Sequence, residues 1–530
     1  MKKLFFALLV LCLCLCACSQ KELRKTSPTT DEDHGGVMRI VTGIIPQVLG
    51  YPPDMGPQDI TMAFPALEPL MTYDNKDLVP FLCDKVDIDS ENARVTFHLK
   101  KGIKFHDGSE LNAETLKWNY QTAIDAKSLQ YYAMVKSIDV LDDYTLRVTL
   151  TDFNNQVIHG LGYFFVISKE SFDANGLDWA RVNCVGTGPF KFVEFKRDAY
   201  VKWTRFDDYW RKDEGLPYLD GIETRFIPDP VTASSIMETQ QADMWLGPGS
   251  QYQRKLADLG LKRQAGDAGL SMWLMPNYRR ADGKWNDKKL REALEYAIDR
   301  DALTKAFGFG FSLPMSLIAS TGDWGYDSNL KRNYDPERAR QLIKEAGYTT
   351  PVKIKILTDA NGQNIASGIK GYLDMAGFNC ELDVADAGRY FGSIYSTGWE
   401  DLAFASSGTD ANFLVTITRW FSPEATALPD FIKPTELIGM WRQAIKKVSI
   451  TEQEAATREM VKYIHDEALI CPLYRLPSSG VMQTWVHSEY LKLGMSQWDM
   501  SRERMEKHWQ ASKTPKSRLA TEPKAEFTQR

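Results

Sequence analysis

The stretch that most constrains the fold of this chain is Gly186-Thr187-Gly188-Pro189-Phe190. Two glycines and a proline within four residues make a rigid turn that few other residues could form. Residues 190–206 then alternate large apolar and polar side chains at the period of a β-strand, with a polar break at 196–199. Alone, this is a tight turn before a hairpin. Beside the other motifs of the chain, it indicates a crossover from one folded unit into a sheet.

Length and composition bound the class of protein. At 530 residues the chain is too long for one ordinary core, so we expect two or three units. Its 43% hydrophobic and 25% charged residues are typical of globular proteins. The net charge of -6 argues against a nucleic-acid partner.

The N-terminus predicts export. Residues 1–17 read as a signal peptide, with two lysines before an apolar run too short to span a bilayer. The segment from Leu15 to Cys18 is similar to a lipobox, which predicts a lipid on Cys18; the alternative is a plain signal peptide cleaved after Ala17. Residues 18–36 are then a lipidated, flexible tether. We expect the protein in the periplasm or at the outer face of the cytoplasmic membrane.

The remaining cysteines leave two interpretations open. Cys83, Cys184, Cys380 and Cys471 lie far apart in the sequence, so they have no metal-binding spacing. In an oxidising compartment Cys83 and Cys184 form a disulfide, or all four are buried thiols.

The body of the chain alternates strand and helix patterns. The strongest helix pattern covers 287–307, and the strand–helix–strand pattern over 352–384 is of α/β type. Strands are expected at 37–42, 93–99, 142–150, 221–227, 242–245, 352–357, 380–384 and 481–486, and helices from Asn112 and over 231–241, 287–307, 335–346, up to Met375, and 452–468.

Catalytic motifs are missing from the sequence. There is no Gly-x-Ser-x-Gly, His-Glu-x-x-His or phosphate-binding loop pattern, and the seven histidines are scattered. His106 lies in a predicted surface turn, where a structural role is favoured over a chemical one. We expect no enzyme, cofactor or metal. A cell-envelope hydrolase, whose catalytic set is assembled only by the fold, is the alternative of another class.

Five motifs in order carry a family resemblance. They are the lipobox at Cys18 and residues 99–108, 186–190, 291–300 and 334–339. Together they resemble the family-5 extracellular solute-binding proteins, the peptide- and nickel-binding lipoproteins of bacterial ABC importers. The resemblance covers roughly residues 37 to 505.

This resemblance implies an α/β, two-lobed periplasmic-binding-protein fold with an extra inserted domain and mixed sheets flanked by helices. A monomer would close on a solute or peptide and deliver it to the permease subunits of an importer. The expected parts are lobe I (37–60, 186–269 and 480–509), an accessory domain (61–185), lobe II (270–479) and a disordered tail (510–530).

The resemblance also indicates where the ligand binds. In the family's peptide binders an aspartate pairs with the ligand's ammonium, and Asp410, after Gly408 and Thr409, occupies the matching stretch. This loop is shorter than the family pattern and lacks its proline. A sugar, an opine or a metal chelate therefore remains an alternative to a peptide. Asp410 is either the ammonium partner or an Asx-turn residue.

Other candidate ligand contacts have two interpretations each. Arg419 either pairs with a ligand carboxylate or is a surface charge. Trp245, Trp399 and Trp420 either line the cleft or pack in the core. Tyr51, in the unusual proline-rich loop 46–53, completes the candidate set.

Overall fold

A computed structural model describes residues 34–74, 77–129, 131–423, 425, 428–488 and 498–506. The predicted signal peptide, the predicted lipid attachment site Cys18 and the tail at 510–530 lie outside the described residues, as does most of the predicted tether.

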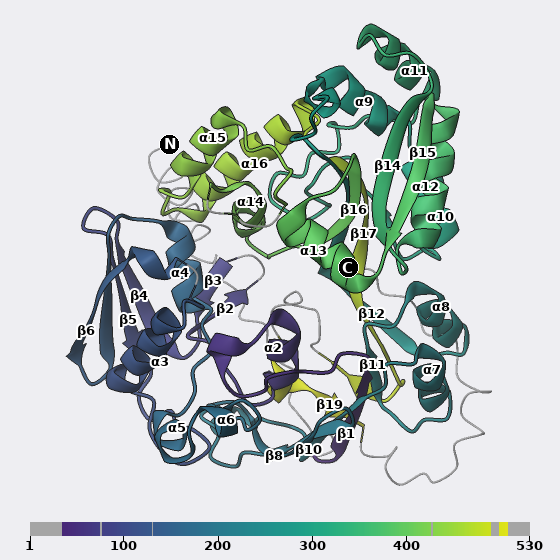
Figure 1. The fold of residues 1–530 in the computed structure, drawn as a ribbon. Helices are drawn as coiled ribbons and strands as arrows, with labels where there is room; N and C mark the ends of the chain where they lie inside the picture. The colour runs from purple at the N-terminus through teal and green to yellow at the C-terminus, as the bar shows by residue number, and fades with distance from the viewer. Residues whose placement is uncertain are drawn as a thin grey trace, which may run out of the picture.

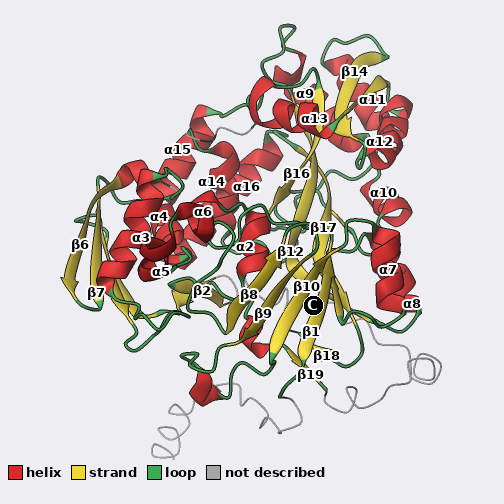
Figure 2. Cartoon of the chain, turned by 60° about the horizontal axis from the view of Figure 1, so that its bottom comes forward, coloured by secondary structure: helices red, strands yellow, loops and turns green. Residues whose placement is uncertain are grey.

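An eleven-stranded sheet runs through the molecule in the order β15-β14-β16-β12-β17-β11-β1-β10-β9-β8, with β13 paired to β17 (Figure 2). Its strands are β1 (Val37–Thr42), β8 (Phe190–Lys196), β9 (Tyr200–Arg205), β10 (Gly221–Phe226), β11 (Met244–Leu246), β12 (Lys262–Pro276), β13 (Leu313–Pro314), β14 (Val352–Asp359), β15 (Phe378–Ala385), β16 (Leu402–Gly408) and β17 (Cys471–Met482).

The long strands β12 and β17 join the two halves of this sheet. They pair antiparallel from Lys262↔Met482 to Leu274↔Cys471, and the ladder is interrupted between Ala265 and Gly269. The last strand was predicted only at 481–486, whereas β17 begins at Cys471. Its first residues are buried without a break and so lack the alternation of a one-sided strand.

The half that contains β1 follows the predicted pattern. β1 pairs parallel with β10 and β11, and β8 and β9 form the predicted hairpin after the Gly186 turn. Buried apolar side chains of β1, β9 and β10 share one hydrophobic cluster. The helices of this half include α7 (Pro230–Glu238) and α8 (Ser250–Asp258).

The other half contains the predicted α/β unit. β14 and β15 pair parallel, and α12 (Gln363–Met375) lies between them in sequence. The remaining helices of this half are α9 (Lys288–Tyr296), α10 (Arg300–Phe307), α11 (Pro336–Glu345), α13 (Ala387–Gly392), α14 (Phe413–Phe421), α15 (Thr435–Ala444) and α16 (Ile450–Asp466).

One helix prediction is wrong in extent. The pattern over 287–307 predicted one helix, but the chain forms α9 and then α10. The carboxylate of Asp299 accepts a hydrogen bond from the backbone N–H of Ala302 and caps α10 as a new helix. The apolar period continues across this break, so periodicity alone predicts one helix.

A separate unit forms from residues before the Gly186 turn, drawn in purple and blue in Figure 1. Its antiparallel sheet has the order β4-β5-β7-β6, and α3 begins at the predicted N-cap Asn112. Its elements include β4 (Cys83–Asp89), β5 (Arg94–Leu99), β6 (Val135–Asp142), β7 (Thr145–Leu150), the pair β2 (Met71–Asp74) and β3 (Asp77–Pro80), and the helices α3 (Ala113–Asp125), α4 (Asn155–Gly162), α5 (Lys169–Asn175) and α6 (Leu177–Ala180).

The Gly186 turn packs backbone against backbone at the border of this unit. A Cβ at Gly186 would lie 2.1 Å from the carbonyl oxygen of Ala66, and a Cβ at Gly188 would lie 2.7 Å from the carbonyl carbon of Ala66. His106 Nε2 lies 2.9 Å from the Gly188 carbonyl oxygen. His106 is therefore buried rather than in a surface turn, and burial lowers its pKa to about 4. Its structural role was predicted.

The four cysteines of the described residues, Cys83, Cys184, Cys380 and Cys471, are free and buried. A disulfide between Cys83 and Cys184 is thereby excluded in this structure, and the buried-thiol interpretation holds.

The close contact at Ala66 predicts a stability effect. Gly188→Ala should lower the free energy of unfolding by about 1–3 kcal/mol, because the added methyl group meets main-chain atoms. The matched control is Gly371→Ala in α12, where an added Cβ has no neighbour within 4 Å and alanine is the better helix former. Urea unfolding tests both variants, and equal midpoints for the two would contradict the packing argument.

Candidate ligand-binding site

The predicted ligand loop lies at one edge of the α/β unit. β14 pairs parallel with both β15 and β16, so the carboxyl ends of these strands share that edge. In open α/β sheets, ligands bind outside the carboxyl ends of the strands. β16 ends at Gly408, and the chain continues through Thr409 and Asp410 into α14.

Asp410 is held by side chains of α14. Its Oδ2 lies 2.6 Å from Arg419 Nη2 and accepts a hydrogen bond from Thr416 Oγ1 at 2.9 Å. The backbone N–H of Asp410 donates to the same Thr416 hydroxyl, and Arg419 Nη1 donates to the Gly408 carbonyl at 3.1 Å. The structure thus brings together three of the predicted residues: Gly408, Asp410 and Arg419.

The side chain of Thr409 is held by a residue of β17. Its Oγ1 accepts a hydrogen bond from Nη2 of the buried Arg475, whose Nη1 forms a 2.8 Å ion pair with Asp323. This contact ties the loop to β17, the strand shared by both halves of the sheet. The loop is therefore held by contacts within the chain itself.

The predicted aromatic residues are all buried. Trp420 and Trp399 belong to one hydrophobic cluster, and their indole N–H groups donate to Ser407 Oγ and the Met275 carbonyl. Trp245 and Tyr51 lie in two other clusters, where they pack on Tyr252 and Phe172. In this conformation the four rings are core residues, and only Trp420 lies next to the Asp410 loop.

An aromatic cluster of the first unit lies within electrostatic reach of Asp410. Tyr73, His159 and Tyr163 have ring centroids 5.7 to 6.0 Å apart. Burial and then the charge of Asp410 raise the pKa values of Tyr73 and Tyr163. Burial lowers the pKa of His159, and Asp410 opposes that shift. Sequence analysis missed this cluster because no motif joins β2 and α4 to the Asp410 loop.

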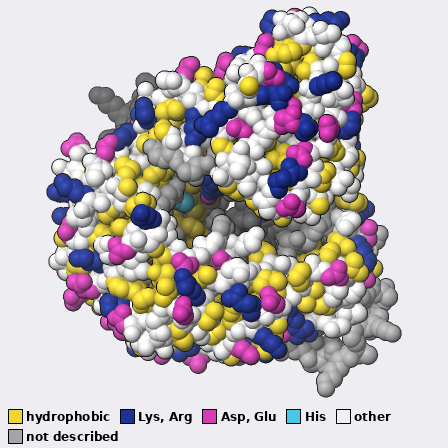
Figure 3. All heavy atoms as spheres, viewed as in Figure 1, with side chains coloured by type: hydrophobic (Ala, Val, Ile, Leu, Met, Phe, Trp, Pro, Cys, Tyr) yellow, Lys and Arg dark blue, Asp and Glu magenta, His cyan; other side chains and the backbone are white. Residues whose placement is uncertain are grey.

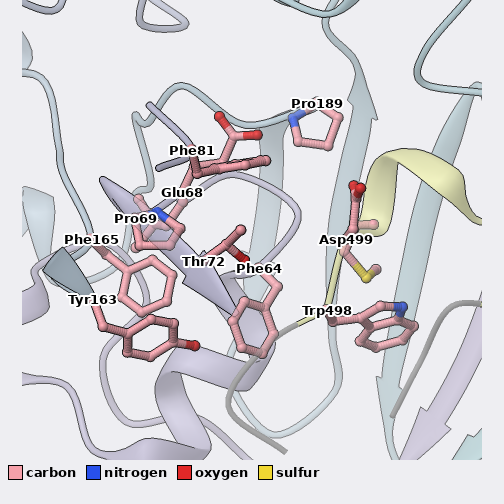
Figure 4. Close-up of a pocket in the computed structure, with 12 residues that line it drawn as sticks. Phe64, Glu68, Pro69, Thr72, Phe81, Tyr163, Phe165, Pro189, Trp498 and Asp499 are labelled. Atoms are coloured by element: carbon pink, nitrogen blue, oxygen red, sulfur yellow. The ribbon is translucent and has the colours of Figure 1, made fainter. Parts of the chain in front are cut away.

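A cavity of about 90 Å³ adjoins this cluster (Figure 4). The rings of Phe64, Phe81, Tyr163 and Phe165 line it. Glu68, Thr72 and Asp499 supply polar groups to its wall. Apolar walls with a few polar groups are typical of small-molecule sites. Tyr163 belongs to both the cavity wall and the aromatic cluster, so these two features adjoin.

Glu68 is a buried carboxylate on this wall. It accepts hydrogen bonds from Thr187 Oγ1 at 2.9 Å, Tyr209 Oη at 2.6 Å and Trp210 Nε1 at 2.9 Å. Burial raises its pKa to about 7, although the three hydrogen bonds oppose this shift.

The raised pKa of Glu68 predicts a pH dependence of stability. Between its ordinary value of 4.5 and about 7, folded Glu68 keeps a proton that the unfolded chain has lost. The contribution of Glu68 to the free energy of unfolding is therefore fully present below pH 4.5. It falls by about 3 kcal/mol in total as the pH rises to about 7. Glu68→Gln should flatten this decline in urea midpoints measured from pH 5 to 7.5.

The control for this measurement is Glu170→Gln at an exposed position of α5, which should keep the parent's profile. A Glu68→Gln profile as steep as that of the parent would show that Glu68 does not titrate in this range.

Direct contacts join the first unit to the α/β half. Asn155, at the start of α4, donates from Nδ2 to the carbonyls of Ala444 and Lys447 at 2.9 and 2.8 Å, and its backbone N–H donates to the Ile445 carbonyl. Lys446 pairs with Asp152. These bonds satisfy carbonyls at the end of α15. The space-filling view shows a hollow between the parts so joined (Figure 3).

Neither a metal site nor a membrane span is evident in the part of the chain that the structure describes. Its His, Cys, Asp and Glu side chains form no group of three placed to hold an ion. Its helices include none with the length and apolar character needed to cross a bilayer.

Comparison with known proteins decides the family. Residues 77–427 match the family described as "Bacterial extracellular solute-binding proteins, family 5 Middle". The chain belongs to this family. It is a family of binding proteins rather than enzymes, which answers the envelope-hydrolase alternative.

Curated relatives of this family-5 protein bind different solutes. The glutathione-binding protein GsiB of Pectobacterium atrosepticum is 30% identical over 337 residues, which cover 61% of this chain and 63% of the relative. Heme-binding protein A of Haemophilus influenzae is 28% identical over 303 residues, which cover 51% and 54%. The match thus spans less than two thirds of the length of either relative.

Solved structures share the fold of the family-5 protein. DppA from Helicobacter pylori, in complex with the peptide STSA, is 24% identical with a TM-score of 0.75, and the match covers 90% of this chain and 99% of DppA. NikA from Brucella suis, in complex with Fe(III)-EDTA, is 20% identical with a TM-score of 0.76, covering 88% and 99%. The predicted α/β periplasmic-binding-protein fold is thereby confirmed.

Proposed function

We propose that this family-5 protein captures a peptide between two lobes and delivers it to the permease subunits of an ABC importer. The observation that carries the proposal is the Asp410–Arg419 ion pair, which follows the carboxyl end of β16 and leaves both side chains partly exposed. Relatives support it: DppA and AppA were solved with peptides, and GsiB is named for the tripeptide glutathione.

We assign the lobes with the bounds predicted from the sequence. Lobe I comprises residues 37–60, 186–269 and 480–509, and its accessory domain comprises 61–185. Lobe II comprises residues 270–479. The boundaries near 269 and 480 fall where the β12–β17 ladder is interrupted, between the pairs Ala265↔Ser479 and Gly269↔Pro477. Because fewer hydrogen bonds join the two strands at this interruption, the sheet bends more easily there. We therefore place the hinge at this point.

Closure would bring the accessory domain toward lobe II. Asn155 of α4 bonds to carbonyls at the end of α15. Figure 1 shows α4 and α15 away from β12 and β17. This contact supports closure because the carbonyls at the end of α15 accept the hydrogen bonds that the Asn155 amide would otherwise make to water.

We also propose that the protein acts outside the cytoplasmic membrane as a monomer, anchored by a lipid on Cys18. The support is the lipobox-like sequence before Cys18 together with a family of extracellular binding proteins. A single lipid chain binds membranes weakly, so the anchor would need more than one acyl chain.

Peptide capture predicts ligand-dependent stability. A library of short peptides should contain members that raise the melting temperature; at 100 times the dissociation constant the gain is about 2.7 kcal/mol. The bound peptide should be recovered intact by mass spectrometry, as from a receptor. Sugars, opines and metal chelates are the comparison set, and stabilisation by one of these alone, with no peptide effective, would reject the proposal.

A further inference from the structure

Four buried amide side chains form a series between the first unit and the Asp410 loop. They are Gln156 and Asn155 of α4, Gln453 of α16, and Asn412, the N-cap of α14. Each is at most 8% exposed. A buried amide is costly unless its hydrogen bonds are met, so the partners of this amide series show what it holds together.

The first link of the amide series fixes the orientation of Asn155. Gln156 Nε2 donates to Asn155 Oδ1 at 2.7 Å, which leaves the Asn155 amide nitrogen directed at the end of α15. That nitrogen donates to the carbonyls of Ala444 and Lys447 at 2.9 and 2.8 Å. An amide turned the other way would place its oxygen against two carbonyl oxygens, so the chain itself sets the direction of these bonds.

The Lys447 carbonyl is the junction of the amide series. It accepts one bond from Asn155 of the first unit and one, at 3.2 Å, from Gln453 Nε2 of its own half. A carbonyl oxygen has two lone pairs, so both bonds form at once. Gln453 Oε1 accepts from Asn412 Nδ2 at 3.2 Å, and Asn412 Oδ1 accepts from the backbone N–H of Leu414 at 3.0 Å. The amide series therefore ends in the cap that fixes where α14 begins.

The start of α14 sets the position of the Asp410 loop. Thr416 and Arg419, in the first and second turns of this helix, are the side chains that hold Asp410. A displaced Asn412 cap would displace the turns that carry both of them. The loop is thus connected, through printed hydrogen bonds of one kind, to a contact made by another unit of the fold.

We propose that Asn155 is a positioning residue for the Asp410 loop, and that it acts from the accessory domain through Lys447, Gln453 and Asn412. Docking of α4 on α15 orders the loop, and opening of the lobes, which removes the Asn155 bonds, loosens it. The competing explanation is a local role, in which Asn155 only satisfies carbonyls at the end of α15. Our inference rests on the proposed closure of the lobes but is independent of the kind of solute.

Hydrogen exchange of the full chain tests this inference. In Asn155→Ala the backbone amides of residues 408–416 should exchange about fivefold faster than in the parent, the effect of losing one buried hydrogen bond. The amides of α12, in the same half but outside the amide series, report any change in overall stability. The inference is overturned if residues 408–416 and α12 change by the same factor, or if neither changes.

Asp152→Ala is the matched control. It removes the ion pair with Lys446 at the same contact between the units but no bond of the amide series. The exchange of residues 408–416 relative to α12 should therefore stay that of the parent. A relative increase as large as that in Asn155→Ala would show that any weakening of the contact loosens the loop, which contradicts a specific role for the amide series.

Asn412→Asp cuts the amide series while keeping the helix cap. Aspartate caps helices as well as asparagine does, but it lacks the amide donor to Gln453. In this background, adding Asn155→Ala should leave the exchange of residues 408–416 relative to α12 unchanged, because the connection is already broken. A further fivefold increase in the double variant would show that Asn155 acts on the loop by another route.

The exchange measurement needs no added solute, so its result is separate from that of the peptide screen. If residues 408–416 do not respond to Asn155→Ala while peptides stabilise the protein, the role of Asn155 is local and peptide capture stands. If these residues respond and no peptide stabilises the protein, the positioning role stands and peptide capture fails.

Discussion

The antiparallel pairing of β12 and β17 is the interaction on which the rest of the structure depends. These strands are shared by both halves of the eleven-stranded sheet, and every other strand of it belongs to one half. β17 also carries Arg475, which holds Thr409 and thereby the ligand loop. The proposed hinge and the candidate ligand loop are thus both linked to β17. The ladder has register shifts between Ala265 and Gly269 and between Met272 and Trp273, and the first of these falls at the proposed hinge.

Local chemistry explains which parts of the fold could be predicted. Helices with a capping side chain, such as those after Asn112 and Asp335, begin where expected, because the cap bonds to residues two or three positions away. Strands with alternating apolar and polar side chains could also be predicted. The break at Asp299 could not be predicted. Because the apolar pattern continues across it, Asp299 looks in the sequence like a surface residue of one helix rather than the N-cap of a second helix. The start of β17 was missed because burial on both faces removes alternation.

The site was only partly predictable. The Asp410 loop followed from a family resemblance, and Arg419 followed from its chemistry. Trp399 and Trp420 left two interpretations open in the sequence, since the same ring suits a core or a cleft wall, and here both are buried. Tyr163 and His159 come from a different unit, and only folding brings them within reach of Asp410. Glu68 likewise gained its raised pKa from burial, which no local pattern encodes.

The central claim is that the two lobes close on a solute about the β12–β17 hinge. Spin labels at Ala174→Cys in the accessory domain and Ala455→Cys in lobe II would report it, because both positions are exposed while the four native cysteines of the described residues are buried. Pulsed electron-spin resonance measures the distance between the labels. With a stabilising ligand the distribution should narrow and shift to shorter distances. An identical distribution with and without saturating ligand would contradict hinge closure.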